Sequence, residues 1–325
     1  MVESGAEEKI KEDLLLPRIS LNAKSGKSLI PIGGSFRRYV IKGIIGRGGY
    51  GEIYYAFDPK QHDYVALKIE GKMRRGKLAK RTILEQKILL RMQGRPHCPK
   101  MAASGAEGNL NFIALEVLSI NLSDLRKMAP CKRLGHPTVA RIVQQAIGAL
   151  YDLHNVGYVH RDVKPPNMCF GIRPETRHIL YLLDFGLVRK FMKEDGTLRP
   201  KREKAGFRGT FRYVSVRVHD KEEQCPADDL ISLVYSAIEL SHSFLPWKQV
   251  TNSEQMKQYK KSVAKQGFSQ VAESMGIHMV NVARAVVNLV PWNTVDYHKL
   301  QKMLNGATDG LKVTDPYEWD LWVKK

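Results

Sequence analysis

Short runs of alternating apolar and polar residues fill the first part of the chain, and longer apolar stretches with helical spacing follow. From Tyr39 to Lys68, β-rich runs are broken by glycines and by Asp58-Pro59, a pattern typical of hairpins. Leu78 to Met92 has apolar residues at helical spacing and neither Gly nor Pro, which predicts a helix. Asn111 to Leu118 is apolar almost throughout and predicts a buried strand.

The second part of the chain is dominated by helical patterns. Helices are predicted over Val139 to Leu153, Asp229 to Leu240 and Ile277 to Leu289. A β-rich first part and a helix-rich second part indicate an α+β protein with two lobes. We expect four regions, which are a flexible charged arm over 1–38, a β-rich lobe over 39–118, a helical lobe over 119–304, and an extension over 305–325 packed on the helical lobe.

Composition excludes several classes of protein. Of 325 residues, 43% are hydrophobic and 26% charged, which is ordinary for a globular chain. No stretch approaches 18 uninterrupted apolar residues, and Met1 to Asp13 is mixed in charge, so we expect neither a membrane span nor a signal peptide. The four cysteines lie more than 30 residues apart, which suits free thiols in a reducing compartment. We expect a monomer in the cytoplasm, with the nucleus as a second location.

The net charge is unusual. The chain has 52 Lys and Arg against 33 Asp and Glu, a surplus of +19 that predicts attraction to polyanions. Basic residues concentrate in 72–81 and 199–208. A nucleic-acid-binding protein is therefore one alternative. It would place aromatic residues among the basic ones for stacking, whereas the first segment has none and the second only Phe207. We do not expect nucleic acid as the main partner.

Gly46 to Ile53 fits the pattern G-x-G-x-x-G-x-V, with Ile in the last position. Glycines let a backbone turn lie close over phosphates, where a β-carbon would collide. A plain glycine-rich hairpin turn is the alternative. The flanks are strand-like on both sides, which disfavours a dinucleotide-binding fingerprint and favours a flap over a nucleotide.

Lys68 ends the apolar run Val65-Ala66-Leu67. A lysine there is costly to bury unless an anion meets it. Glu85 is its natural partner, because its neighbours in the predicted helix are apolar and face the core. The alternatives are a lysine that reaches solvent and a solvated glutamate.

The segment His160 to Asn167 carries a more specific pattern. Asp162 supplies a carboxylate that can accept a hydroxyl proton, Lys164 a cation for a γ-phosphate, and Asn167 a carboxamide for a metal ion. Asp184 follows an apolar strand and can bind Mg²⁺ at its end.

These motifs resemble those of eukaryotic protein kinases, and the resemblance covers the chain from about residue 39. More narrowly, the chain is similar to the casein kinase 1 group, especially its tau–tubulin kinase branch. The supporting strings are His160 to Asn167, Leu183 to Leu187, Ala205 to Thr210, Arg212-Tyr213 with Ser215, Asp228 to Leu230, Leu245 to Trp247, and Asp315 to Trp319. The resemblance implies a bilobal kinase fold, with a small β-rich N-lobe and a larger helical C-lobe.

The resemblance also implies a reaction. Asp162 would accept the proton of the substrate hydroxyl, Lys164 would contact the γ-phosphate, and Asn167 and Asp184 would hold Mg²⁺. A lysine at position 164 is typical of serine/threonine kinases, so transfer from ATP to protein Ser or Thr is expected. A pseudokinase scaffold that binds without transfer is the other alternative, but the residues that such proteins typically lose are all present.

We expect three parts of the chain to bind ATP. They are the glycine-rich segment Gly46 to Ile53, the apolar run that ends at Lys68, and the hinge from Leu115 to Leu118. Glu85 would position Lys68 on the α- and β-phosphates, and the Glu116 carbonyl and the Leu118 N–H would face adenine. The ATP-binding residues expected from the resemblance are Ile45, Gly46, Gly48, Gly51, Ile53, Ala66, Lys68, Glu85, Leu115, Glu116 and Leu118.

Two residues depart from the family pattern. Arg217 stands where the casein kinase 1 group has Asn, and Val234 stands where many kinases have Gly. Both residues lie where kinases anchor the activation segment, so both departures affect that anchoring.

The basic charge predicts protein substrates that are acidic or already phosphorylated. Arg202 matches an anion-binding Arg of the group, and a second basic position falls on Gln258, which Lys257 or Lys260 could replace. The residues expected to bind the substrate anion are Arg202, Lys204 and Arg208. The resemblance implies activity without phosphorylation of the activation segment, because the casein kinase 1 group is generally active without it. Thr197 is also the only hydroxyl residue from Leu187 to Arg208, so we expect constitutive activity.

Overall fold

A computed structural model describes residues 16–21, 28–48, 51–74 and 76–322. The chain forms two compact units, one comprising the residues up to Ile120 with Phe170–Arg177, and the other comprising Asn121–Cys169 with the residues from His178. The first is built on β-strands and the second on helices. This division confirms the α+β prediction.

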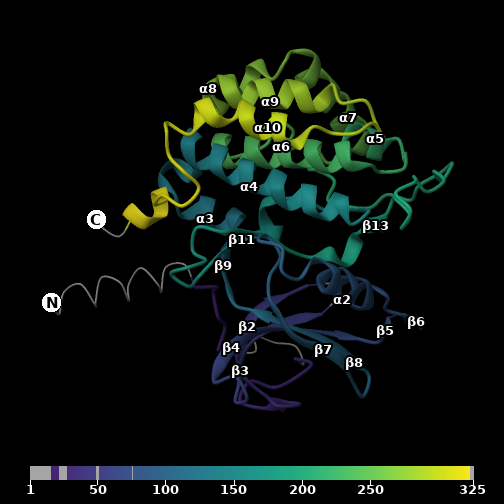
Figure 1. Ribbon diagram of the computed structural model, residues 1–325, viewed down its shortest axis with the longest axis vertical. Coiled ribbons are helices and arrows are strands. Elements are labelled where there is room, and N and C mark those ends of the chain that lie inside the picture. The colour runs from purple at the N-terminus through teal and green to yellow at the C-terminus, as the bar shows by residue number, and fades with distance from the viewer. Residues whose placement is uncertain (1–15, 22–27, 49–50, 75, 323–325) are drawn as a thin grey trace. The chain divides into compact units, whose positions relative to one another are not determined.

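The first unit is built on a curled six-stranded sheet with the order β1-β2-β3-β4-β8-β7, in which neighbouring strands run antiparallel (Figure 1). In β3 (Glu52–Asp58) burial alternates residue by residue, because successive side chains point to opposite faces. One face is a core that includes Tyr39, Tyr54 and Leu67. The other strands and the helix of this unit are β1 (Ser35–Phe36), β2 (Tyr39–Arg47), β4 (Asp63–Gly71), β5 (Met73–Arg74), β6 (Lys77–Leu78), α2 (Arg81–Met92), β7 (Met101–Glu107), β8 (Leu110–Glu116) and β9 (Leu118–Asn121).

The prediction of a flexible arm is wrong for part of residues 1–38. Ser20 pairs with Ile44 through two backbone hydrogen bonds of 2.9 and 3.0 Å. The Leu29 and Ile30 amides donate to side chains of β3, and β1 pairs with β2. Pairing satisfies backbone groups that would otherwise be exposed at the edge of the sheet. Residues 1–15 and 22–27 lie outside the described residues.

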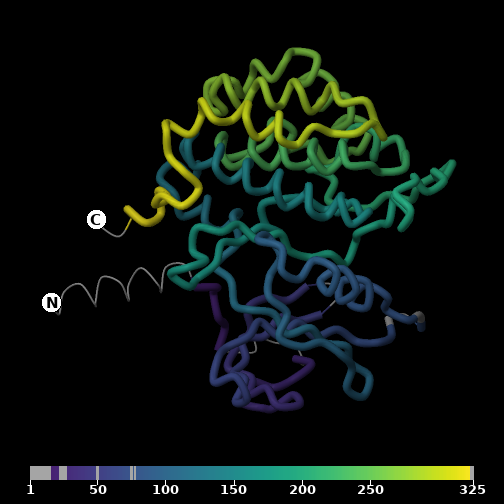
Figure 2. The backbone as a smooth tube through the Cα atoms, viewed as in Figure 1, coloured from purple at the N-terminus to yellow at the C-terminus, as the bar shows by residue number. Residues whose placement is uncertain are grey.

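The second unit is organised around α4 (His136–Asn155) and α6 (Pro226–His242), which lie side by side (Figure 2). Nearly every residue of α6 is buried, and its buried carboxylates Asp228 and Asp229 accept hydrogen bonds from neighbouring segments. The departure at Val234 is accommodated in this core, where its side chain is 2% exposed.

The remaining elements of the second unit are shorter. Its other helices are α3 (Leu122–Met128), α5 (Val216–His219), α7 (Ser253–Lys265), α8 (Ala272–Met275), α9 (Ile277–Val287) and α10 (Tyr297–Met303). Its short strands are β10 (Tyr158–Val159), β11 (Met168–Gly171, which continues into the first unit), β12 (Leu180–Leu182) and β13 (Arg189–Lys190). Its 3₁₀ turns are η1 (Pro130–Lys132), η2 (Pro165–Asn167), η3 (Phe185–Leu187), η4 (Ser269–Val271), η5 (Asn305–Ala307) and η6 (Glu318–Leu321).

The predicted elements occur with shifted bounds. The helix predicted from Leu78 begins at Arg81, because Lys77–Leu78 pairs with Met73–Arg74 in a hairpin. The helix predicted from Val139 begins at His136, where a proline occupies the first turn, as helices tolerate.

Residues after Lys312 pack on α4. The Arg141 guanidinium donates to the carbonyl oxygens of Lys312, Asp315 and Pro316 at 2.9–3.1 Å, and it lies 3.9 Å from the centre of the Tyr317 ring. Arg141 is only 1% exposed. A buried guanidinium needs such acceptors, so this segment completes the core of the second unit.

Candidate active site

The described part of the glycine-rich segment joins β2 and β3. A β-carbon on Gly51 would lie 2.2 Å from the Ile69 carbonyl oxygen, so only glycine fits there. At Gly46 and Gly48 a β-carbon would meet no atom of the described residues within 4 Å. Gly49 and Tyr50, also in the motif, lie outside the described residues.

Several of the residues expected to bind ATP lie on one face of the sheet. Ile53 is paired with Lys68, and Ala66 with Leu115, so these four side chains are neighbours opposite the buried core. Ile45 is half-buried in β2 just before Gly46. Glu116 ends β8 and Leu118 begins β9, where the chain leaves the sheet.

Lys68 and Glu85 form an ion pair within the first unit. The Lys68 Nζ lies 2.6 Å from the Glu85 Oε2, and the Glu85 side chain is 4% exposed against 24% for Lys68. Glu85 comes from the buried side of α2. A buried carboxylate that holds a partly exposed ammonium fixes the position of that cation.

Asp162, Lys164 and Thr210 form a compact polar group in the second unit. The Thr210 hydroxyl donates to the Asp162 Oδ1 at 2.7 Å, while the Lys164 Nζ donates to the Asp162 Oδ2 and to the Thr210 Oγ1, each at 2.8 Å. Asp162 is 7% exposed. A carboxylate that already accepts a hydroxyl hydrogen bond is suited to general-base chemistry on an alcohol. Sequence reasoning missed Thr210, although it lies in a string quoted for the resemblance.

Asp229 of α6 holds this loop in place. Its carboxylate accepts hydrogen bonds from the His160 and Arg161 amides at 2.6 and 2.8 Å, and from the His154 ring at 2.9 Å. Burial alone would raise the pKa of Asp229, but the hydrogen bond and charge of His154 and the contact with His160 lower it, so the carboxylate stays ionised. Gly209 packs so closely that a β-carbon would lie 2.5 Å from the Arg161 carbonyl oxygen.

Asn167 and Asp184 come from neighbouring segments. The Leu183 amide donates to the Asn167 carbonyl oxygen at 2.9 Å, and Asp184 follows directly with φ +61°. The Asn167 Nδ2 donates to the Asp162 carbonyl oxygen at 2.8 Å, which directs the amide group. A carboxylate and a carboxamide oxygen are the hard donors that Mg²⁺ prefers, so this pair fits the ion.

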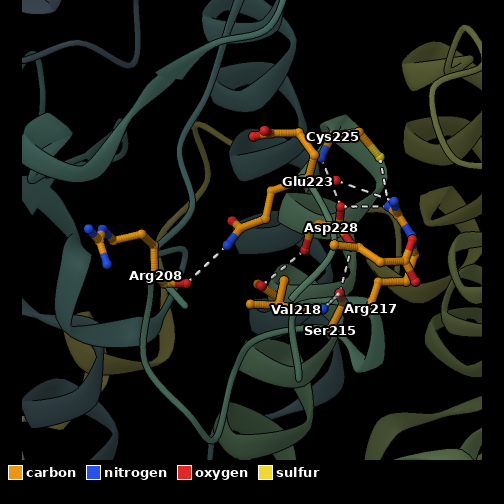
Figure 3. Close-up of polar contacts among 10 residues, drawn as sticks. Arg208, Ser215, Arg217, Val218, Glu223, Cys225 and Asp228 are labelled. Atoms are coloured by element: carbon orange, nitrogen blue, oxygen red, sulfur yellow. Dashed lines mark hydrogen bonds and ion pairs between the residues drawn. The ribbon is translucent and has the colours of Figure 1, made fainter. Parts of the chain in front are cut away.

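The three residues expected to bind a substrate anion differ in their contacts. Arg202 makes a forked ion pair with Glu223, at 2.5 Å (Nε–Oε2) and 3.0 Å (Nη2–Oε1). The Arg208 guanidinium donates to the Phe207 carbonyl oxygen at 2.8 Å, and in Figure 3 it points away from the cluster around Asp228. Lys204 is exposed.

Neither lysine near Gln258 is available for a substrate anion in this arrangement. Lys260 is 1% exposed and donates to the Phe211 and Val214 carbonyl oxygens. Lys257 forms ion pairs with Asp220 and Glu254 at 2.8 and 2.7 Å. The suggestion that either could replace the second basic position is therefore wrong for Lys260, because its ammonium is buried under backbone carbonyls.

Arg217 anchors the segment before α6 (Figure 3). Its Nη1 donates to the Asp228 Oδ2 at 2.9 Å, its Nη2 to the Glu223 carbonyl oxygen at 3.2 Å, and its Nε to the Glu222 carboxylate at 3.0 Å. The Ser215 hydroxyl donates to the other oxygen of Asp228 at 2.6 Å. The departure from Asn thus supplies a charged anchor.

Comparison with known proteins agrees with this geometry. Residues 39–292 match the family model described as "Protein kinase domain". A Caenorhabditis elegans protein named "Putative casein kinase I" is 44% identical over 286 residues, which cover 87% of this chain and 83% of that protein. A Dictyostelium discoideum protein named "Probable serine/threonine-protein kinase" is 31% identical over 286 residues, 87% of this chain and 57% of the relative.

A third relative, the "Serine/threonine-protein kinase spe-6" of Caenorhabditis elegans, is 29% identical over 278 residues, covering 84% of this chain and 73% of its own length. The family match spans most of the chain and includes the glycine-rich segment, the Lys68–Glu85 pair and the Asp162 loop. The chain therefore belongs to the protein kinase family, as a casein kinase 1-like serine/threonine kinase that uses ATP.

Proposed function

We propose that this kinase phosphorylates Ser or Thr in acidic or already phosphorylated protein segments, and that it does so without first being phosphorylated itself. The observation that carries the assignment of roles is the contact between Thr210 and Asp162, in which the carboxylate accepts a hydrogen bond from a hydroxyl group. A substrate hydroxyl would donate to the same carboxylate, which Thr210 and Lys164 hold in place.

In the reaction, the substrate oxygen attacks the γ-phosphorus of ATP, and the bond to the β-phosphate oxygen breaks, releasing ADP. Asp162 accepts the hydroxyl proton, and Lys164 neutralises charge on the transferred group. Lys68, held by Glu85, binds the α- and β-phosphates. Asn167 and Asp184 would hold Mg²⁺, which supplies neutralisation of phosphate charge when bound.

The preference for acidic substrates is supported by local charge. From Arg199 to Arg208 there are five basic residues and one acidic residue, and Lys204 and Arg208 are exposed. A phosphate beside the target hydroxyl would be attracted to such a surface, and a guanidinium fork could pair with it.

Independence from phosphorylation is supported by the position of Thr197. Its hydroxyl donates to Asp195 at 2.6 Å on an exposed turn, and it is the only hydroxyl residue between Leu187 and Arg208. Two arginines of the same region, Arg189 and Arg202, already form ion pairs with the carboxylate of Glu223.

The test is transfer of labelled phosphate from ATP with Mg²⁺ to three matched peptides that are neutral, acidic or already phosphorylated. Protein treated with phosphatase should remain active and should favour the acidic and phosphorylated peptides. Asp162→Asn should abolish transfer but keep nucleotide binding. Equal rates on all three peptides would refute the preference, and activity that depends on phosphorylated Thr197 would refute constitutive activity.

A further inference from the structure

Four arginines gather around the segment from Asp184 to Arg217, which we call the activation segment. Arg161 precedes it in the catalytic loop, and Arg189, Arg202 and Arg208 belong to it. Burial, followed by the positive charges of Arg189, Arg202 and Arg208, lowers the pKa of Arg161 to about 10. In kinases switched by phosphorylation, a phosphate on this segment pairs with the Arg of the catalytic loop and with neighbouring cations. A cluster of like-charged arginines is stabilised by a negatively charged partner.

Glu223 supplies an anion from within the chain. Its Oε1 lies 2.7 Å from the Arg189 Nε and 3.0 Å from the Arg202 Nη2, and its Oε2 lies 2.5 Å from the Arg202 Nε. Its side chain is 6% exposed. Burial would raise the pKa of Glu223, but the hydrogen bond from Arg202 and the charge of Arg189 lower it overall, so the group is ionised.

The backbone around Glu223 is held from two directions. The Arg217 Nη2 donates to the Glu223 carbonyl oxygen, and the Cys225 amide donates to Asp228 at 2.8 Å at the start of α6. Towards the activation segment, the Ala205 amide donates to the Lys221 carbonyl oxygen at 2.9 Å. The Gln224 side chain donates to the Arg208 carbonyl oxygen at 3.0 Å (Figure 3). Hydrogen bonds therefore connect the backbone around Glu223 to both α6 and the activation segment.

We propose that Glu223 is a positioning residue that takes the place of an activating phosphate, and that it holds the activation segment ready for substrate through Arg189 and Arg202. Arg217 keeps Glu223 at that place. This inference rests on the proposed function and adds the reason why phosphorylation would not be needed. One carboxylate carries less charge than a phosphate, but it makes three short charge-assisted contacts here.

The test replaces the carboxylate and then supplies an anion. Glu223→Ala should lower kcat/KM on the order of 10- to 100-fold, because two arginines lose their shared partner. Millimolar inorganic sulfate should restore part of the activity of this variant, whereas in the parent it should inhibit or have no effect. Sodium chloride at the same ionic strength controls for screening. Glu194→Ala, which removes an exposed carboxylate paired with Lys190, is the matched control and should stay within about threefold of the parent.

Limited trypsin digestion gives a readout that does not depend on activity. The Glu223→Ala protein should be cut faster between Arg199 and Arg208, and sulfate should slow that cutting. The isosteric Glu223→Gln should resemble Glu223→Ala, because the charge is lost while the shape remains.

Full activity of Glu223→Ala, or a loss that sulfate changes neither in rate nor in cleavage, would overturn the proposal. An inactive parent protein would instead refute the proposed function, and the protection of the segment from trypsin would still test Glu223.

Discussion

The Lys260 ammonium donates a hydrogen bond of 2.7 Å to the Val214 carbonyl oxygen, although its side chain is almost completely buried. It also donates to the Phe211 carbonyl oxygen at 2.9 Å and to the His219 ring at 3.1 Å. Burial, followed by the charge of Lys260, lowers the pKa of His219 to about 4, so this ring is a neutral acceptor at pH 7. Lys260 thus supports the end of the activation segment from α7.

Replacing this lysine should destabilise the protein and change its pH dependence. Lys260→Met leaves the buried Val214 carbonyl oxygen and the partly buried Phe211 carbonyl oxygen without this donor and should cost about 2 kcal/mol of unfolding free energy at pH 7. Burial lowers the pKa of Lys260 from 10.5 to about 7. Between these values the unfolded chain binds the extra proton, so the contribution of this group to stability rises with pH from about 7 to 10. Urea unfolding across this range should show that rise in the parent and not in Lys260→Met.

Lys261→Met is the control, because Lys261 is exposed on the same helix. If both variants kept the parent's stability and pH dependence, the hydrogen bonds from Lys260 would carry no net energy.

The hydroxyl of Thr210 should matter for catalysis through its contacts with Asp162 and Lys164. Thr210→Val should lower kcat about tenfold, while Thr210→Ser should keep most of the activity, because only the serine retains a hydroxyl at that place. Steady-state kinetics on one peptide would measure this. A serine variant as slow as the valine variant would mean that the methyl group, rather than the hydroxyl, is needed.

Loss of Asp162 or Lys68, the residues proposed to act in catalysis and ATP binding, should be far more severe. Asp162→Ala and Lys68→Ala should each lower the rate by roughly 10³-fold or more, equivalent to about 4 kcal/mol at the transition state. Nucleotide binding, measured by calorimetry, should survive the Asp162 change. Variants as fast as the parent would show that the roles are assigned to the wrong residues.

The anchor at Arg217 should be needed for stability. Arg217→Ala leaves Asp228, which is 3% exposed, without its cation and should cost about 3 kcal/mol of unfolding free energy. Arg217→Lys should recover only part, because an ammonium cannot contact Asp228, Glu222 and the Glu223 carbonyl oxygen as a guanidinium does.

The cost of Arg217→Ala should also depend on pH. Burial raises the pKa of Asp228 above its usual value, and Arg217 opposes that effect. Without the arginine the folded state should hold a proton to higher pH, so the stability lost at pH 7 should shrink at pH 5. Denaturant unfolding of both proteins at the two pH values measures this difference. A cost that is unchanged or larger at pH 5 would contradict the account.

The three residues proposed to bind the substrate anion should fall into two groups. Lys204→Ala and Arg208→Ala should raise KM for a phosphorylated peptide about three- to tenfold and leave a neutral peptide nearly unchanged. Arg202→Ala should instead lower kcat for both peptides, because it removes one of the two arginine partners of Glu223. A selective effect of Arg202→Ala on the phosphorylated peptide would return this residue to direct substrate binding.

Much of the candidate site could be predicted from sequence because its residues are close together in local motifs. Asp162 and Asn167 lie five residues apart in one loop, and Lys68 and Glu85 belong to consecutive elements. The α+β organisation in two parts could also be predicted, because the periodicity of apolar residues is a local pattern as well.

Other features depend on contacts that no local pattern reveals. Glu223 lies 21 residues from Arg202 and 34 from Arg189, and nothing in its own neighbourhood marks it as their partner. Lys260 has the sequence context of a surface lysine, yet tertiary packing buries it. The arm was misjudged because its polar composition hides the few backbone groups that pair with the sheet at Ser20 and Ser35.

The contact between Arg141 and the chain after Lys312 has a consequence for biosynthesis. α4 leaves the ribosome about 170 residues before the carbonyl groups that Arg141 requires. Until those residues emerge, the nascent helical unit carries a guanidinium with no acceptor at its final place. The last steps of folding must therefore wait until synthesis has passed Pro316, and a ribosome stalled before that point would present an incomplete unit to chaperones.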